Sequence, residues 1–464
     1  MNFDTNYLNK FKNKIALIDT NNVKYSYNDL INESKKLEKK FVKNSLILLV
    51  TSNSIESIIG YFSFLNKNKN CKIIILDESF GNDYFNKIMS IYKPNYVFYP
   101  SKFFIKKKES TKCHIYKNYI IRKTKNSTHT KINHENFVLL SSSGTTGNPK
   151  FIRLSRGNIV TNTQSIIKSL NITSNHKTIT TMPMGYSYGL SIINTHILSG
   201  ATIVINKNTV LEKIFWLKVS KYKISSFGGV PQLYQFIKKI NFHKFNLPKL
   251  KYITVAGGHL DLGIKKYFVN LSLKKKFKFF AMYGQTEASP RISCFNTALN
   301  RSKLDSIGKP INGVKLMIFD EKNKIITKPF RKGEISVMGS NVCLGYASKL
   351  KDLHKGDINK SLIKTGDIGF FDNEKYFYIT GRKKKISKIL GIRVDLNDIE
   401  NYLKKKNITS YCHPSNKKLK IKIMKNYDES KILNLINKKY KINKNFIEIS
   451  KTKISKKYTF KKID

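Results

Sequence analysis

The sequence predicts an α/β fold in which a mostly parallel sheet is covered by helices on both faces. Short apolar runs alternate with amphipathic segments up to about residue 130, and the alternation resumes after a lysine-rich stretch. Because parallel strands need a crossover, usually a helix, this alternation is typical of a doubly covered sheet. A change to short segments divided by turns near Ser306 predicts a β-rich portion at about 306–380.

The predicted strands share a short aliphatic or aromatic run: 15–18, 46–50, 72–76, 96–99, 137–140, 201–205, 253–256, 279–282, 314–319 and 333–337. The predicted helices have apolar residues at helical spacing: 27–41, 54–65 and 158–170. The lysine-rich stretch 106–125 is expected to be a surface excursion. The whole is predicted to divide into a large N-terminal domain, 1–382, and a small C-terminal α+β domain, 383–464.

Composition excludes several classes of protein. Hydrophobic residues make up 40% of the 464 residues, which is enough for a large core and excludes wholesale disorder. No run approaches the ~18 apolar residues of a membrane span, and no signal peptide is visible at the N-terminus. The five cysteines lie far apart, so neither a disulfide framework nor a zinc site is expected, and a cytoplasmic location fits.

The net charge of +56 has two interpretations. Such an excess is typical of proteins that bind nucleic acid or anionic membranes. Only eight of the 86 basic residues are arginine, however, and the lysines are scattered along the chain with Asn and Ile. Residues that read bases are more often Arg. We therefore expect compositional drift and no specific nucleic-acid partner, although a nucleic-acid binder stays open as an alternative.

The segment Ser141-Ser-Ser-Gly-Thr-Thr-Gly-Asn-Pro-Lys150 directly follows a predicted strand. Gly144 and Gly147 let backbone N–H groups face inward, and hydroxyls and Lys150 add further donors for anionic oxygens. The spacing differs from that of the common nucleotide-binding loop. The segment predicts a triphosphate site; a flexible surface loop is the alternative.

Two further segments carry groups suited to a nucleotide. Tyr283-Gly-Gln-Thr-Glu287 follows another predicted strand, at the carboxyl end where ligands of α/β sheets bind. Thr365-Gly-Asp367 precedes Gly381-Arg382 and the segment 391–394 that contains Arg393. An aspartate can accept both hydroxyls of a ribose, and arginine can donate to sugar or phosphate. Each segment alone is equally compatible with a solvated turn.

In this order the three segments resemble the adenylate-forming superfamily: acyl-CoA synthetases, luciferases and the adenylation domains of peptide synthetases. The resemblance runs from Tyr25-Ser-Tyr-Asn-Asp-Leu30 to the C-terminal lysines. Shorter matching pieces lie at 182–190, 228–231, 257–258, 307–310, 333–335 and 345–346. Any one piece is common, whereas the ordered set is specific to this superfamily.

The resemblance implies that a carboxylate attacks the α-phosphate of ATP, and that a thiol then takes the acyl group and releases AMP. By matched position, Tyr283 would stack on adenine, Thr286 would contact the α-phosphate, Glu287 would bind Mg²⁺, and Asp367 with Arg382 would hold the ribose. The other residues expected at ATP are Ser143, Gly144, Thr145, Thr146, Gly147, Lys150, Gly257, Gly258, Gly284 and Arg393.

The resemblance also implies that the small C-terminal domain rotates between the two half-reactions about a hinge at Lys384. A lysine in the tail would stabilise the transition state of adenylation. The tail departs from the expected Pro-x4-Gly-Lys pattern, with Ser455 and Phe460 at the proline and glycine positions. Counting forward selects Lys461 and counting back selects Lys462, so both remain candidates.

The substrate pocket implied by the resemblance contains Tyr186, Ser187, Gly189 and Gly228. Relatives that activate amino acids have an aspartate in this segment, which the match places at Gly189. We therefore expect a fatty, aryl or other organic acid without an α-amino group. The thiol acceptor would be coenzyme A; a phosphopantetheine carrier protein, or a degenerate homologue that only binds adenylate, are the alternatives.

Overall fold

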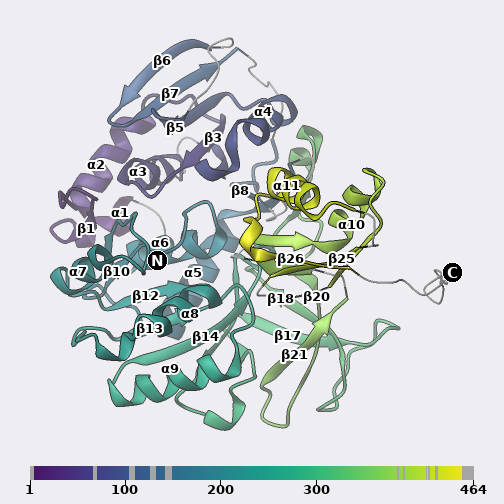
Figure 1. Cartoon of the computed structure of the whole chain (residues 1–464). Helices are drawn as coiled ribbons and strands as arrows, with labels where there is room; N and C mark the ends of the chain where they lie inside the picture. The colour runs from purple at the N-terminus through teal and green to yellow at the C-terminus, as the bar shows by residue number, and fades with distance from the viewer. Residues whose placement is uncertain are drawn as a thin grey trace. The chain divides into compact units, whose positions relative to one another are not determined.

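The computed structural model describes residues 5–65, 70–103, 110–125, 132–141, 149–383, 386–389, 392–413, 415, 418–423 and 427–451. The chain divides into two compact units, with the division between Gly381 and Arg382. The larger unit carries two mixed sheets and a smaller antiparallel one, with most of the helices (Figure 1).

The first large sheet has nine strands in the order β16-β15-β14-β13-β12-β10-β11-β1-β2. Its strands are β1 (Ile15–Ile18), β2 (Lys24–Ser26), β10 (Lys177–Ile179), β11 (Thr202–Val204), β12 (Ser226–Gly229), β13 (Tyr252–Val255), β14 (Lys278–Gly284), β15 (Arg291–Asn296) and β16 (Lys309–Pro310). The strands from β1 to β14 in the middle of this order pair in parallel, and antiparallel strands close both edges.

The second large sheet has eight strands in the order β19-β9-β8-β4-β3-β5-β7-β6. They are β3 (Leu46–Thr51), β4 (Lys72–Asp77), β5 (Tyr96–Pro100), β6 (Ser110–Tyr116), β7 (Tyr119–Thr124), β8 (Val138–Ser141), β9 (Phe151–Leu154) and β19 (Gly345–Ala347). The expected surface excursion at 106–125 is wrong for its described part. Ser110–Tyr116 and Tyr119–Thr124 form a hairpin at the edge of the sheet, with a register shift between Ser110 and Lys112, and Tyr119 and Ile121 are buried.

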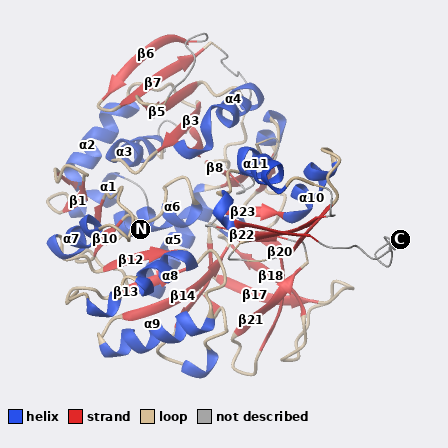
Figure 2. Cartoon of the chain, viewed as in Figure 1, coloured by secondary structure: helices blue, strands red, loops and turns tan. Residues whose placement is uncertain are grey.

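The helices of the larger unit are α1 (Thr5–Leu8), α2 (Tyr27–Glu38), α3 (Ile55–Phe64), α4 (Gly81–Tyr92), α5 (Arg156–Leu170), α6 (Ser187–Leu198), α7 (Lys213–Lys221), α8 (Pro231–Lys239) and α9 (Leu262–Lys274). Two of them begin with a capping box, in which Ser26 of α2 and Ser155 of α5 accept from the backbone three residues on. The longer helices surround the strands of both large sheets (Figure 2).

Successive residues of a central strand belong to different cores, as a sheet covered on both faces requires. Ile253 and Phe279 pack with Phe268 of α9, whereas Tyr252 and Phe280 lie in the cluster that contains α5 and α6. The second sheet follows the same rule with α4 on one face and α2 and α3 on the other. The predicted α/β class is therefore confirmed.

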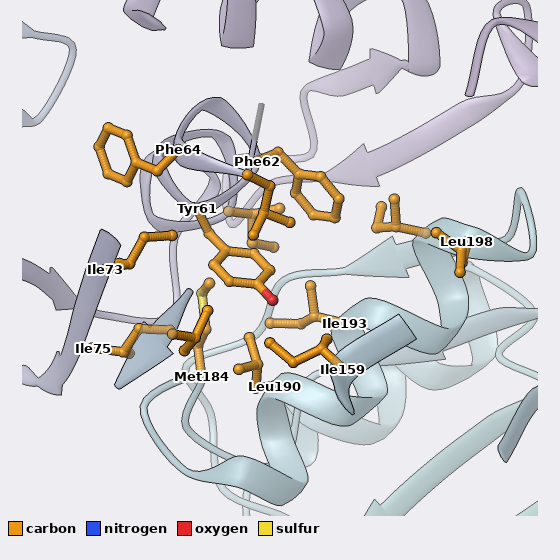
Figure 3. Close-up of a cluster of buried hydrophobic side chains, with 14 of the residues drawn as sticks. Tyr61, Phe62, Phe64, Ile73, Ile75, Ile159, Met184, Leu190, Ile193 and Leu198 are labelled. Carbon is orange, nitrogen blue, oxygen red and sulfur yellow. The ribbon is translucent and has the colours of Figure 1, made fainter. Parts of the chain in front are cut away.

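One apolar cluster joins helices from distant parts of the sequence. Figure 3 shows Tyr61 of α3 pointing toward Leu190 and Ile193 of α6, with Ile73 of β4 at the side. These side chains are almost fully excluded from solvent. The cluster fixes α6 against the strands, and the first residues of α6 contribute to the site described below.

The β-rich portion is a four-stranded antiparallel sheet in the order β17-β18-β20-β21. Its strands are β17 (Val314–Phe319), β18 (Gly333–Gly339), β20 (Leu362–Phe371) and β21 (Phe377–Arg382). The smaller unit has a hairpin and a three-stranded sheet with two helices. Its elements are β22 (Ile386–Ile389), β23 (Ile392–Asp395), α10 (Leu396–Lys404), β24 (Ser410–His413), β25 (Leu419–Ile423), α11 (Glu429–Tyr440) and β26 (Ile447–Lys451). This is the α+β composition predicted for the C-terminal region.

Arg153 of β9 is fully buried and holds the end of the second sheet to the chain on both sides of β19. Its Nη2 donates to the carbonyls of Leu344 at 2.9 Å and Gly356 at 3.1 Å, and its Nη1 donates to the carbonyl of Lys355. The buried charge is thus matched by three carbonyl acceptors, since a buried cation needs hydrogen-bond partners.

We expect Arg153→Met to lower the free energy of unfolding by about 3 kcal/mol or more, because three carbonyls would lose a charged donor. Arg301→Met is the matched control at an exposed arginine, where the change should stay within about 0.5 kcal/mol. Urea unfolding of both variants measures the difference. Equal stability of the two variants would contradict the role given to Arg153.

Candidate functional site

The site is built around the turn that follows β14. The parallel strands β12, β13 and β14 are in register, so their carboxyl ends reach the same edge of the sheet. Gly284 ends β14, and a Cβ placed on it would lie 2.0 Å from the carbonyl oxygen of Pro290. Only glycine allows this approach, which directs the next residues into a short 3-10 helix, η5 (Thr286–Ala288).

Tyr283, the aromatic residue before this turn, contacts Asp367, the residue predicted to bind the ribose. The Tyr283 hydroxyl donates to Oδ2 of Asp367, in β20, at 2.5 Å. Tyr283 was predicted to stack on adenine and Asp367 to bind the sugar. The base and sugar of one nucleotide are covalent neighbours, so adjacent Tyr283 and Asp367 side chains are compatible with both roles.

A second group of contacts joins Glu287, Tyr346 and Lys150. The Tyr346 hydroxyl donates to Oε1 of Glu287 at 2.9 Å, and Lys150 Nζ lies 3.8 Å from the centre of the Tyr346 ring. Tyr346 is on β19, which pairs with β9 directly after Lys150. Glu287, the predicted metal ligand, and Lys150, the predicted phosphate-binding lysine, therefore both contact the side chain of Tyr346.

Thr286 lies against the start of α6. Its Oγ1 is 3.0 Å from Oγ of Ser187, the first residue of that helix. Beside it, the hydroxyl of Tyr186 is 2.9 Å from the position that a Cβ would take on Gly257, which has a φ of +88°. A residue with a side chain at 257 would be strained and would collide with the phenol, which explains the glycine. Gly258 follows, next to the ring of Pro231.

Gly189 does not indicate whether the substrate has an α-amino group, contrary to the expectation from the sequence. A Cβ at this position would lie 2.0 Å from the carbonyl oxygen of Pro183, so no side chain can enter a pocket from residue 189. The absence of an aspartate there follows from backbone packing and says nothing about the substrate. Gly228 is similarly confined, because a Cβ would lie 2.5 Å from the Tyr188 hydroxyl.

Several predicted site residues lie outside the described residues: Ser143, Gly144, Thr145, Thr146, Gly147, Lys384, Lys461 and Lys462. Arg382 is half-buried at the last residue of β21. Arg393 is on β23, where only its backbone is described.

Within the described part of the chain, no three His, Cys, Asp or Glu side chains gather in a way that could hold a metal by themselves. Mg²⁺ is usually held by one or two carboxylates together with substrate phosphates. The almost buried carboxylate of Glu287, with Lys150 nearby for the phosphates, is a donor set that fits such an ion.

Two residues of this region were not assigned a role from the sequence. Tyr346 was noted only as part of a short matching piece, and its contact with Glu287 depends on a pairing between strands far apart in sequence. Arg291 was overlooked, although arginine is rare in this chain. Arg291 starts β15 immediately after the turn and is 2% exposed.

A Tyr-Thr-Glu turn at the carboxyl edge of a sheet, with a neighbouring lysine and aspartate, is typical of α/β enzymes that bind a nucleotide. The family model of the AMP-binding enzyme matches residues 5–347, and the chain belongs to this family. It is therefore an enzyme of the AMP-binding family.

Curated relatives include the oxalate–CoA ligase of Saccharomyces cerevisiae, which is 30% identical over 56% of this chain and 48% of the relative. The 2-succinylbenzoate–CoA ligase of Bacillus subtilis is 25% identical over 57% of this chain and 53% of the relative. The chain thus spans about half the length of the curated relatives it matches.

Solved structures resemble almost the whole chain. The O-succinylbenzoate coenzyme A synthetase of Bacillus subtilis, bound with a product analogue, has a TM-score of 0.75 and covers 96% of this chain and 94% of its own at 18% identity. The same enzyme in complex with ATP and magnesium ion has a TM-score of 0.66 and covers 96% of this chain and 95% of its own at 18% identity. At this identity the likeness shows the adenylate-forming fold.

No helix in the described ranges combines the length and the hydropathy needed to cross a bilayer.

We expect Asp367→Ala to weaken ATP binding about tenfold or more, because a charged acceptor for the ribose would be lost. Tyr283→Phe is the matched control, since it removes the hydroxyl on Asp367 and keeps the ring; its effect should stay below about threefold. Isothermal titration with ATP measures both, and melting temperatures check folding. Unchanged ATP affinity in a folded Asp367→Ala protein would remove Asp367 from the site.

Proposed function

We propose that this protein joins a carboxylic acid to a thiol, with coenzyme A as acceptor, through an acyl adenylate formed from ATP. The single observation that carries the proposal is that Glu287 and Lys150 both contact Tyr346, at its hydroxyl and at its ring, close to Thr286 in the turn after β14. A carboxylate, a cation and a hydroxyl donor close together are the groups that attack on a triphosphate requires, which supports the proposal.

Each side chain then has a part in the first half-reaction. Lys150 neutralises phosphate oxygens as charge builds up, and Thr286 donates to the α-phosphate that the acid attacks. Glu287 holds Mg²⁺, which when bound supplies charge neutralisation on the departing pyrophosphate. Tyr283 and Asp367 hold the base and ribose, so the α-phosphate is kept at Thr286.

The acceptor is inferred from the relatives and their names. The names of these relatives end in CoA ligase for oxalate, 2-succinylbenzoate, 4-coumarate and long-chain fatty acids, so they agree on coenzyme A and disagree on the acid. Loading of a carrier protein is the outcome that would contradict coenzyme A as the acceptor.

We propose that the smaller unit rotates about Lys384 between the two half-reactions, as the resemblance to the adenylate-forming superfamily implies.

Because Gly189 says nothing about the substrate, the expectation of an acid without an α-amino group must rest on another observation. The cavity beside Tyr188 and Met282 has no aspartate or glutamate among its described lining residues. An α-ammonium group buried there would have no carboxylate to pair with, which costs several kcal/mol. We propose an organic acid without that group.

The direct test is AMP formation from ATP with a panel of acids, in the presence of coenzyme A or a phosphopantetheine carrier. We expect acid-dependent AMP and an acyl-CoA product. Exchange of pyrophosphate with free alanine, or acylation of the carrier alone, would contradict the corresponding part of the proposal.

Glu287→Gln should lower kcat for AMP formation about 100-fold or more, because it removes the metal-binding charge while the amide oxygen still accepts from Tyr346. Raising the Mg²⁺ concentration should restore part of the lost rate. Glu321→Gln, at an exposed glutamate, is the control and should leave kcat unchanged. A magnesium dependence identical to that of the wild type would exclude Glu287 as the ligand.

The tail assignment predicts that one of Lys461→Ala and Lys462→Ala slows adenylation about 100-fold and leaves thiol transfer from a supplied acyl adenylate intact. Lys457→Ala is the control in the same lysine-rich tail. Separate assays of pyrophosphate exchange and of transfer distinguish the two half-reactions. Normal exchange in both variants would show that the essential lysine is elsewhere.

A further inference from the structure

Arg291 places a guanidinium in a small cavity between α6 and the strands β12 to β15. The cavity is about 20 Å³, and its polar lining includes Arg291, Tyr188, His196, Ser226 and Thr254. A space of this size accommodates about one water molecule. Arg291 itself is 2% exposed, so its charge is removed from bulk solvent.

The guanidinium has no anionic partner among the described residues. Its Nε is buried without a hydrogen bond, and the centre of the Tyr188 ring lies 4.9 Å from its Cζ. The Nε of Arg153, another deeply buried arginine, is also without a hydrogen bond, but its terminal nitrogens donate to three carbonyls. The side chain of Arg291 has no such acceptor among the described residues. Buried charges are normally paired, so an unpaired one at a cavity indicates a missing anion.

The other titratable groups around this charge are neutral near pH 7. Burial lowers the pKa of His196 to about 4 and raises the pKa of Tyr188 to about 12. Burial also raises the pKa of the Cys294 thiol to about 12. Burial lowers the pKa of Arg291, yet a guanidinium stays protonated in proteins. The cavity therefore carries one positive charge.

Hydrogen bonds to the backbone of Arg291 fix its position at the end of the turn, and with it the point from which the side chain extends. Its N–H donates to Oδ1 of Asn162 at 3.1 Å, and its carbonyl accepts from Nδ2 of Asn162 at 2.7 Å and of Asn341 at 3.1 Å. The chain runs from Thr286, at the reacting end, through the turn to Arg291. One short segment thus supports both the reacting end and the charged cavity.

We infer that Arg291 binds a second carboxylate of the acid substrate, so that the enzyme selects dicarboxylic acids. This inference rests on the proposed function and adds the class of acid. A carboxylate accepts a bidentate pair of hydrogen bonds from a guanidinium and would supply the absent anion. Its entry requires the lining side chains to move, and Met282, an adaptable side chain, is among them.

The first test compares acids that differ only in the second carboxylate: glutarate with valerate, and phthalate with benzoate. We expect wild-type kcat/KM for AMP formation to favour the dicarboxylate of at least one pair by tenfold or more. Arg291→Met should lose that preference and keep adenylation of the monoacid. Wild-type activity with monoacids alone would overturn the inference and leave the ligase function standing.

The second test separates binding from folding. Removing an unpaired buried charge should leave the melting temperature of Arg291→Met equal to or above that of the wild type, whereas Arg153→Met should melt lower. The preferred dicarboxylate should raise the melting temperature of the wild type but not of Arg291→Met, whether or not AMP forms. A variant that fails to fold, or one that still responds to the dicarboxylate, would show that Arg291 is structural.

Discussion

The close approach of Gly284 to the Pro290 carbonyl is the constraint on which the site depends. It lets β14 stop and turn at once, and the side chains on either side of the turn then contact elements from distant parts of the chain: Asp367 through Tyr283, Ser187 through Thr286, and Tyr346 through Glu287. Each contact alone is worth little. Together they position the groups of a nucleotide site on a rigid sheet edge, where small displacements would be costly for catalysis.

The sequence predicted the elements with strong periodicity, because burial on two faces leaves a clear pattern. The aliphatic runs of β3, β4 and β13 are examples. It missed the hairpin β6–β7, since lysines on an exposed face hid the buried Tyr119 and Ile121. It also could not show that Gly189 is bare for reasons of packing, because a collision with Pro183 depends on tertiary structure.

The residues of the candidate site divide in the same way into those that the sequence predicted and those that it did not. Residues within one continuous segment, such as Tyr283 with Glu287, could be grouped from their order alone. Tyr346 and Arg291 could not, since their significance lies in a strand pairing and in an unmatched buried charge. For Arg291, rarity was the one indication available: this chain uses lysine at most basic positions, and arginine differs from lysine in its planar geometry.

The late strand β19 has a consequence for how the chain is made. It adds Gly345–Ala347 to the edge of a sheet whose other strands all end by Leu154. Nearly two hundred residues are therefore synthesised after β9 before β19 is made. During that time the backbone donors and acceptors along one edge of β9 have no partner strand. An edge exposed for that long invites wrong pairing between nascent chains, and the buried Arg153 beside it is satisfied only when the same late segment arrives.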